Sequence, residues 1–265
     1  EMDTDLCYIP IDHSLPIDGF NHEQKLSMGA FSSVYLSSLK KFPQCKVAIK
    51  EIFVQNANTN QLAKSHLIKE VNAIKSFSNN FIAQLFDIVE TKDHVYLILE
   101  YVENGNILQH LNQSGPFEGK SVQLLISQII NILYFLHNEK HIIHRDIKAE
   151  NVLLDRFGNI KIVDFGLCNH FTHADQEFTS VCGSIQYLAP EIIQNRPYTK
   201  AVDIWSAGVL IYFIVVGQLP FEDISMHHLL KKILHTNPQY PSSLDPNLVN
   251  LLKRMLCKDP NERIT

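Results

Sequence analysis

Two short stretches carry residues whose types and spacing suit phosphoryl transfer. The first runs from His144 to Asn151 with the sequence HRDIKAEN, and the second is Asp164-Phe165-Gly166, which begins thirteen residues further on. Asp146 can orient an attacking hydroxyl, while Asn151 and Asp164 offer the hard oxygen ligands that Mg²⁺ prefers. The cation is needed because a nucleophile approaches a negatively charged phosphoryl group only when its oxygens are neutralised.

The segment between the two stretches decides whether they belong together. Either string alone turns up by chance in loops. Here two alternating apolar runs, Val152–Leu154 and Ile160–Val163, flank a turn at residues 156–159 and predict a short β-hairpin. With both strings in order around this hairpin, a chance match falls to roughly one in a hundred or less.

At this point the chain resembles the eukaryotic protein kinase family, and the resemblance runs from residue 20 to residue 265. Residues 47–50, with the sequence VAIK, match a motif whose lysine binds nucleotide phosphates and pairs with a glutamate of the next helix. The resemblance implies ATP and Mg²⁺ as cofactors. It also implies Asp146, Lys148, Lys50 and Glu70 as catalytic residues, and Asn151 and Asp164 as metal ligands.

The glycine-rich loop of the family is degenerate in this chain. The pattern G-x-G-x-x-G-x-V falls on Ser27, Gly29, Ser32 and Val34, so only the middle glycine remains. Serine keeps the backbone donor but lacks the conformational freedom of glycine, so we expect weaker nucleotide binding. The implied nucleotide-binding residues are Leu26, Ser27, Gly29, Ser32, Val34, Ala48, Lys50, Leu99, Glu100, Val102, Leu153 and Asp164, with Leu99 in the gatekeeper position.

Residues 164–191 correspond to the activation segment of the family. The resemblance implies Ser180 as the regulatory phosphorylation site, with Thr179 as the alternative. A phosphate there adds about −1.5 to −2 charges and can bind Arg145 beside the catalytic aspartate. An upstream activating kinase is therefore an implied partner. Glu191, which closes the segment, is implied to pair with Arg263 in a structural role.

Two positions resemble those of the family members that phosphorylate serine or threonine rather than tyrosine in protein substrates, and this resemblance implies the same acceptors here. Lys148 lies two residues after the catalytic aspartate, and Ser184 follows Cys182-Gly183 in the loop that faces the acceptor. With Glu150, Ser184 is implied to contact the substrate. The stretches 144–151 and 182–184 further resemble the calcium/calmodulin-dependent group, nearest to the AMP-activated and microtubule-affinity-regulating kinases.

The elements that must position these residues give an α+β fold of two lobes. We expect an N-terminal extension over residues 1–19, then a lobe over 20–102 with a small five-stranded antiparallel sheet and one main helix near 61–77. A larger, mainly helical lobe is expected over 103–265, because the apolar period changes to 3.6 and residues 201–216 are apolar nearly all round. The last residues resemble the family's penultimate helical region, so we expect a truncated C-terminal end.

The composition limits the classes of partner that the protein is expected to bind and the cell compartment in which we expect it. A net charge of −5 leaves no basic stripe for nucleic acid and no polybasic patch for a membrane. The longest apolar run, Val209–Val216, is far shorter than the ~18 residues that a spanning helix needs. Five cysteines without zinc-like spacing predict reduced thiols. We expect a cytoplasmic or nuclear protein, and the sequence leaves its oligomeric state open.

Two other functions remain open. A pseudokinase scaffold would bind nucleotide or a partner without turnover, and the degenerate glycine loop favours it. The intact Lys50, Glu70, Asp146, Asn151 and Asp164 argue against it. A small-molecule kinase of the same fold is disfavoured by the activation segment and the Ser184 loop, because these form a peptide-docking surface.

Overall fold

The structure is a computed structural model that describes residues 17–29, 32–53, 60–75, 77, 79–173 and 175–265. The chain divides into two compact units, Glu1–Val102 and Glu103–Thr265. In the part of the chain that is described, no helix combines the length and the apolarity needed to cross a membrane. The predicted α+β class is confirmed, since the first unit holds a sheet and the second is mainly helical.

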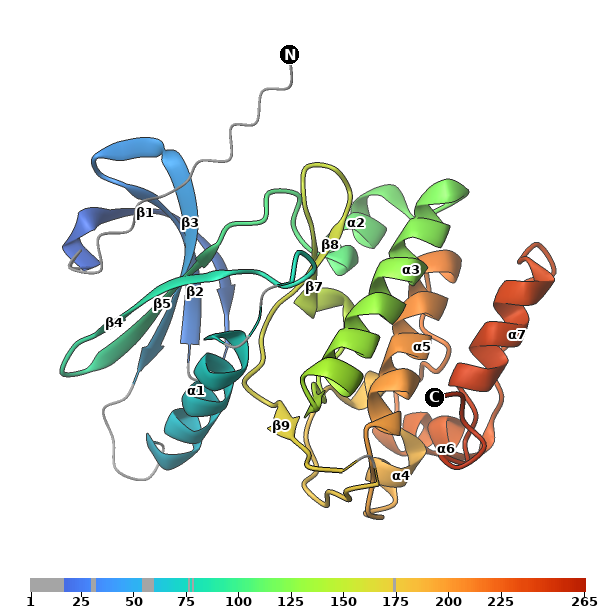
Figure 1. Ribbon diagram of the computed structural model, residues 1–265. Coiled ribbons are helices and arrows are strands. Elements are labelled where there is room, and N and C mark those ends of the chain that lie inside the picture. Colours follow the sequence, from blue (N-terminus) through green and yellow to red (C-terminus); the bar gives the residue numbers. More distant parts are fainter. Residues whose placement is uncertain (1–16, 30–31, 54–59, 76, 78, 174) are drawn as a thin grey trace. The chain divides into compact units, whose positions relative to one another are not determined.

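The first unit is built on a five-stranded antiparallel sheet with the strand order β1-β2-β3-β5-β4 (Figure 1). One helix, α1, packs against β3. The apolar pattern at residues 81–88 predicts a strand there, but the continuous strand begins at residue 85; Ile82 forms an isolated bridge, and Ile82 and Ala83 are both buried. The elements are β1 (Phe20–Met28), β2 (Ser32–Leu39), β3 (Phe42–Phe53), α1 (Asn60–Lys75), β4 (Leu85–Glu90) and β5 (His94–Glu100).

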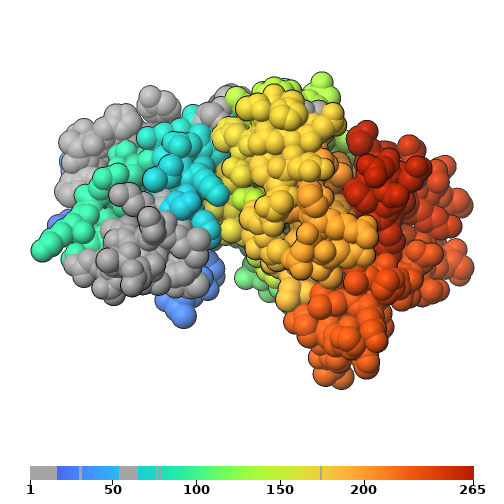
Figure 2. All heavy atoms as spheres, turned by 90° about the horizontal axis from the view of Figure 1, so that it is seen from below, coloured from blue at the N-terminus to red at the C-terminus, as the bar shows by residue number. Residues whose placement is uncertain are grey.

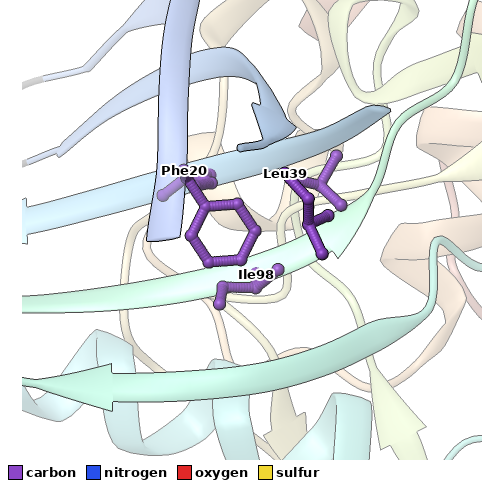
Figure 3. Packing of buried hydrophobic residues seen from close by; sticks show 5 residues of the cluster. Phe20, Leu39 and Ile98 are labelled. Atoms are coloured by element: carbon purple, nitrogen blue, oxygen red, sulfur yellow. The ribbon is translucent and has the colours of Figure 1, made fainter. Parts of the chain in front are cut away.

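The two faces of this sheet are both apolar but have different partners. On one face Phe20, Leu39 and Ile98 pack together with two residues of β3, and Ile17 of a short 3-10 turn (Ile17–Gly19) packs against this cluster (Figure 3). The last residues of the predicted extension therefore contact the sheet, while residues 1–16 lie outside the described part. On the other face Ile52 and its neighbours on β5 pack with side chains of α1.

The second unit is organised around α5 (Ala201–Val216), which is buried along almost its whole length. This agrees with the sequence, in which residues 201–216 are apolar nearly all round. Helices α3 and α7 pack against α5 (Figure 1). The helices are α2 (Ile107–Ser114), α3 (Lys120–Tyr134), α4 (Pro190–Ile193), α5, α6 (Met226–His235) and α7 (Pro246–Met255).

Two differences from the expected helices have local causes. Residues 107–114, for which the sequence predicted no helix, form α2, and Asn106 begins it with a capping box in which its side chain accepts from the Gln109 N–H. Apolar residues recur at helical spacing over 122–137 and predict one helix, but α3 ends at Tyr134 and the chain continues as a single π turn, Phe135–Glu139. That turn carries the buried His137, whose ring is hydrogen-bonded to Asp203.

The predicted hairpin is present as β7 (Val152–Leu154) and β8 (Ile160–Ile162). Asp155 stabilises its turn, because one carboxylate oxygen accepts from the backbone N–H groups of Phe157 and Asn159, at 2.8 Å each. Gly158 takes a left-handed conformation there, with φ of 80°. A second small ladder pairs β6 (Ile142–Ile143) with β9 (Asn169–His170). The hairpin and this ladder border the loop that carries residues 144–151.

Candidate active site

Lys50 and Glu70 form the predicted ion pair within the first unit. The Lys50 amine lies 2.8 Å from each Glu70 carboxylate oxygen, and Glu70 is 3% exposed. The register of the sheet explains the geometry: Lys50 shares with Ile52 the face of β3 that packs on α1, and side chains alternate along a strand. The pair therefore forms because α1 covers that face.

The glycine-rich turn joins β1 to β2, and its residues Ala30 and Phe31 lie outside the described part. The Gly29 N–H donates to the Ser32 carbonyl at 2.8 Å. Among the described residues, a β-carbon at Gly29 would meet the Ser32 hydroxyl at 3.5 Å and the Ser32 carbonyl at 3.7 Å, both ordinary contacts, and Gly29 has no left-handed φ. Glycine is thus not sterically required here, and any need for it would come from a ligand. Leu26, Ser27, Ser32 and Val34 lie on the two strands that flank the turn.

The other nucleotide-binding candidates of the first unit lie on adjacent strands. Ala48 on β3 pairs with Leu99 on β5 and with Leu36 on β2. Glu100 ends β5, where its backbone N–H donates to the Gln84 carbonyl at 2.8 Å. The sheet thus brings Ala48 and Leu99 side by side. Val102, two residues beyond β5, is buried. In the second unit, Leu153 lies on β7 and forms an isolated bridge with Asn106.

Asp146 is the centre of a hydrogen-bonded cluster in the second unit. The Lys148 amine donates to its Oδ2 at 2.7 Å, and the Asn151 amide donates to the same oxygen at 2.9 Å. Oδ1 accepts only a long bond of 3.3 Å from the Ser184 hydroxyl. That hydroxyl also accepts from Lys148, at 2.9 Å. The Ser184 hydroxyl therefore occupies a position that an acceptor hydroxyl could take, beside both a carboxylate and an ammonium group.

A buried carboxylate holds the backbone of this loop. Asp203, fully buried in the first turn of α5, accepts from the backbone N–H groups of His144 and Arg145 and from the His137 ring, at 2.8 Å each. Burial acts to raise the pKa of Asp203. The hydrogen bond and the electrostatic interaction with His137, together with the interactions with His144, outweigh it, so the pKa lies below its usual value. Arg145 needs such support because its φ is 68°, in the left-handed region.

His144 has a packing role. Its ring lies edge-on to Phe165, with centroids 4.7 Å apart, and its Nδ1 accepts from the Asp146 N–H at 3.3 Å. Complete burial lowers the pKa of His144, although nearby carboxylates oppose the shift. Its Nε2 has no hydrogen-bond partner among the residues that the structure describes. The ring is therefore neutral near pH 7 and serves to pack the second motif against the first.

The oxygen donors near Asp146 fit Mg²⁺ better than a metal ion whose ligands are all protein side chains. No group of three or more His, Cys, Asp or Glu side chains suited to a metal occurs among the described residues. The Asn151 amide nitrogen is engaged by the Asp146 carbonyl and carboxylate, so the amide oxygen is the atom left for a cation. Asp164, with a left-handed φ of 66°, supplies a carboxylate. Mg²⁺ commonly takes one or two carboxylates and completes its shell with water and phosphate oxygens.

The loop with Ser184 is fixed by close packing and two hydrogen bonds. A β-carbon at Gly183 would lie 2.7 Å from the Arg145 carbonyl, and its φ of 102° suits glycine alone. The Tyr187 hydroxyl accepts from the Ala149 N–H at 3.3 Å, and its carbonyl accepts from the Ser206 hydroxyl at 2.9 Å. Burial raises the pKa of Tyr187, so this hydroxyl stays protonated. By contrast Glu150, the other substrate-contact candidate, is exposed.

Ser180 and Thr179 are both exposed, but only Ser180 has a side-chain contact with Arg145. The guanidinium donates to the Ser180 hydroxyl at 2.6 Å and to the Leu167 carbonyl at 2.7 Å. Of the two predicted regulatory positions, Ser180 is therefore the one that lies beside the cation.

Glu191 and Arg263 form the expected pair, and both are buried. Arg263 donates to the two carboxylate oxygens of Glu191 at 2.7 and 3.0 Å, and also to the Ala201 and Cys257 carbonyls. This pair connects the end of the activation segment to the last described residues. The hydrogen bonds of Arg263 go to Glu191 and to the Ala201 and Cys257 carbonyls, and this agrees with a structural role.

Comparison with known proteins identifies the class. The family described as protein kinase domain matches residues 20–265, so the chain belongs to that family. An Aurora kinase of Dictyostelium discoideum is 34% identical over 249 residues, which are 94% of this chain and 64% of that protein. The chain thus spans just under two thirds of the length of this relative. Aurora kinases are a different group from the one that the two short stretches resemble, so that finer placement is not confirmed.

Two residues with structural roles at the site were not identified from the sequence as site residues. Asp203 anchors residues 144 and 145, and Tyr198 contacts both Arg145 and Ser180. A charged residue in an otherwise apolar helix is a signal that could have revealed Asp203. No local signal could have revealed Tyr198, because its partners lie 18 and 53 residues away.

Proposed function

We propose that this chain is the catalytic domain of an ATP- and Mg²⁺-dependent protein serine/threonine kinase. The observation that carries the proposal is the cluster in which Asp146 is hydrogen-bonded to Lys148, Asn151 and Ser184. ATP supplies the phosphoryl group, and Mg²⁺ neutralises its oxygens. The Asp146 carboxylate orients the acceptor hydroxyl and accepts its proton, and Lys148 stabilises charge on the transferred group. Lys50, fixed by Glu70, binds the nucleotide phosphates.

The test is transfer of ³²P from labelled ATP to a degenerate serine/threonine peptide library. Wild type is compared with Asp146→Asn, which keeps the size of the side chain but loses the charge. Asp18→Asn, an exposed position in the first unit, is the matched control. We expect activity in the wild type and the control and a loss of several powers of ten in Asp146→Asn. Equal transfer by all three proteins would refute the proposal.

Activation by phosphorylation of Ser180 is a further part of the proposal. Support comes from the position of its hydroxyl against the Arg145 guanidinium, where a phosphate would gain charge-assisted hydrogen bonds. The segment has Asn169 where related kinases often carry a second basic residue, so we expect moderate activation. An upstream kinase, or the chain itself, would supply the phosphate.

A pseudokinase remains the second candidate because Ser27 and Ser32 replace two glycines of the nucleotide loop. It predicts that nucleotide raises the melting temperature while the peptide library stays unlabelled. The resemblance to the calcium/calmodulin-dependent group also stays a proposal. It rests on residues 144–151 and 182–184, whereas the similarity to an Aurora kinase extends over 249 residues.

A further inference from the structure

Tyr198 joins the activation segment to the residues that begin α5. Its backbone pairs with that of Phe178 in an isolated antiparallel bridge, with N–H to carbonyl distances of 2.8 and 2.9 Å. The two rings pack with centroids 6.0 Å apart, and Tyr198 is 3% exposed. In Figure 2 the yellow and orange parts of this unit, which hold the two segments, adjoin on the surface.

The Tyr198 hydroxyl lies at the point where Ser180 meets Arg145. It donates to the Ser180 carbonyl at 2.7 Å and accepts from Arg145 Nη1 at 3.2 Å. It also lies 3.3 Å from the Ser180 hydroxyl, which in turn accepts from Arg145 Nη1 at 2.6 Å. One phenol group is thus in contact with the backbone and the side chain of the proposed phosphorylation site, and with the guanidinium that would bind the phosphate.

The Tyr198 hydroxyl connects residue 180 to Arg145 through neutral hydrogen-bonding groups of its own. A phosphate on Ser180 would make the same connection through its charge. Arg145 is itself fixed through the Leu167 carbonyl and through Asp203. We propose that Tyr198 is a positioning residue, which holds residues 178–180 against Arg145 while Ser180 carries no phosphate. The assignment of Ser180 as the regulatory site rests on the proposed function, but the contact itself does not.

The proposal predicts a difference between the two phosphorylation states. Without phosphate, the bonds of the Tyr198 hydroxyl are among the few that hold residue 180 in place, so basal activity depends on them. With phosphate, charge-assisted bonds between the phosphate and Arg145 are roughly twice as strong as neutral ones. The contribution of Tyr198 then becomes a small part of the total, and the phosphorylated enzyme tolerates its loss.

The test is Tyr198→Phe, which keeps the ring and removes only the hydroxyl. Hydrogen exchange of the Phe178 and Tyr198 amides, which donate to each other's carbonyls, is measured on dephosphorylated protein, together with peptide phosphorylation before and after modification of Ser180. Tyr212→Phe is the matched control, because Tyr212 is also buried in this unit and donates to a backbone carbonyl, that of Gln239. We expect about two- to tenfold faster exchange and a similar fall in basal activity for Tyr198→Phe only, which is the factor for one net hydrogen bond.

Ser180→Ala is the second variant and covers the case in which Tyr198→Phe folds poorly. It removes the serine hydroxyl but keeps the bond from Tyr198 to the residue-180 carbonyl. Because Ser180 is exposed, water can replace its hydroxyl beside Arg145, so exchange should rise less than in Tyr198→Phe. The proposal is overturned if Tyr198→Phe exchanges like wild type, or if Ser180→Ala loosens the segment as much as Tyr198→Phe does. If wild type transfers no phosphate in either state, the proposed function fails, while the exchange comparison still decides the role of Tyr198.

Discussion

Replacing Arg263 by methionine should destabilise the second unit strongly while leaving the residues of the Asp146 cluster in place. The Arg263 side chain is fully buried and makes four hydrogen bonds, two of them to Glu191. Methionine fills much of the space but offers no donor. Glu191 is itself 3% exposed, so its carboxylate would remain buried without a counter-charge.

The expected cost follows from that uncompensated charge. Removing one partner of a buried ion pair typically costs about 3–5 kcal/mol. For a domain of this size each kcal/mol lowers the melting temperature by about 2–4 °C, so the expected decrease is about 6–20 °C. The single tryptophan, Trp205, gives a direct assay, because it is buried in this unit with the Arg263 guanidinium 5.3 Å from its ring centre. Its fluorescence in urea therefore reports the unfolding of the second unit.

Two further variants separate the ion pair from the packing. Glu191→Gln combined with Arg263→Met removes both charges, so it should be less destabilised than the sum of the single changes, by about 0.5–3 kcal/mol. Arg156→Met, at an exposed turn, should stay within about 0.5 kcal/mol of wild type. A cost below about 1 kcal/mol for Arg263→Met, or strict additivity in the double variant, would refute the reasoning.

Three other outcomes are expected. Lys50→Met should cut phosphoryl transfer by several powers of ten. An unchanged urea midpoint, followed by Trp205 fluorescence, would show that the second unit is intact. If phosphorylation activates the chain, Ser180→Ala should abolish its response to phosphatase treatment, whereas Thr179→Ala should keep it; mass spectrometry would check the sites. Because burial lowers the pKa of His144, the native state binds fewer protons than the unfolded chain, so stability should fall as pH drops below about 6.5, by up to about 1.4 kcal/mol per pH unit. Urea unfolding from pH 7.5 to 5 in wild type and His144→Gln would test this, and equal slopes would contradict it.

The sequence predicted best those elements that are determined by strong local patterns. Residues 201–216, apolar nearly all round, predicted the bounds of α5, and the alternating runs around residues 156–159 predicted the β7–β8 hairpin. Helix α2 was missed because eight residues with a mixed pattern give a weak periodic signal, and its capping box only becomes evident once the helix is known. The start of β4 was placed too early because the buried apolar residues 82 and 83 precede the continuous strand, and Ile82 forms an isolated bridge there.

The candidate site shows the same division between local and distant causes. Motifs located Lys50, Asp146 and Asn151, because their spacing along the chain is itself the signal. The hydrogen bonds that set the geometry join residues far apart, such as Asp203 with residues 144 and 145 or Tyr198 with Ser180. Asp203 stands out in the sequence as the charged residue of an otherwise apolar helix, but that signal does not reveal its partners, and Tyr198 has no such signal. Contacts of this kind depend on how the helices pack, and no period or composition encodes them.

The packing of α5 explains why three functional segments keep a fixed relation in the second unit. Asp203 in its first turn binds the backbone before Asp146, and the Ser206 hydroxyl binds the carbonyl of Tyr187 in the substrate loop. The Ala201 carbonyl accepts from Arg263, which pairs with Glu191 at the end of the activation segment. A helix that is apolar on every side cannot turn toward solvent without exposing part of its core, so these three attachments are held at constant spacing. The most apolar stretch of the chain therefore positions its most polar site.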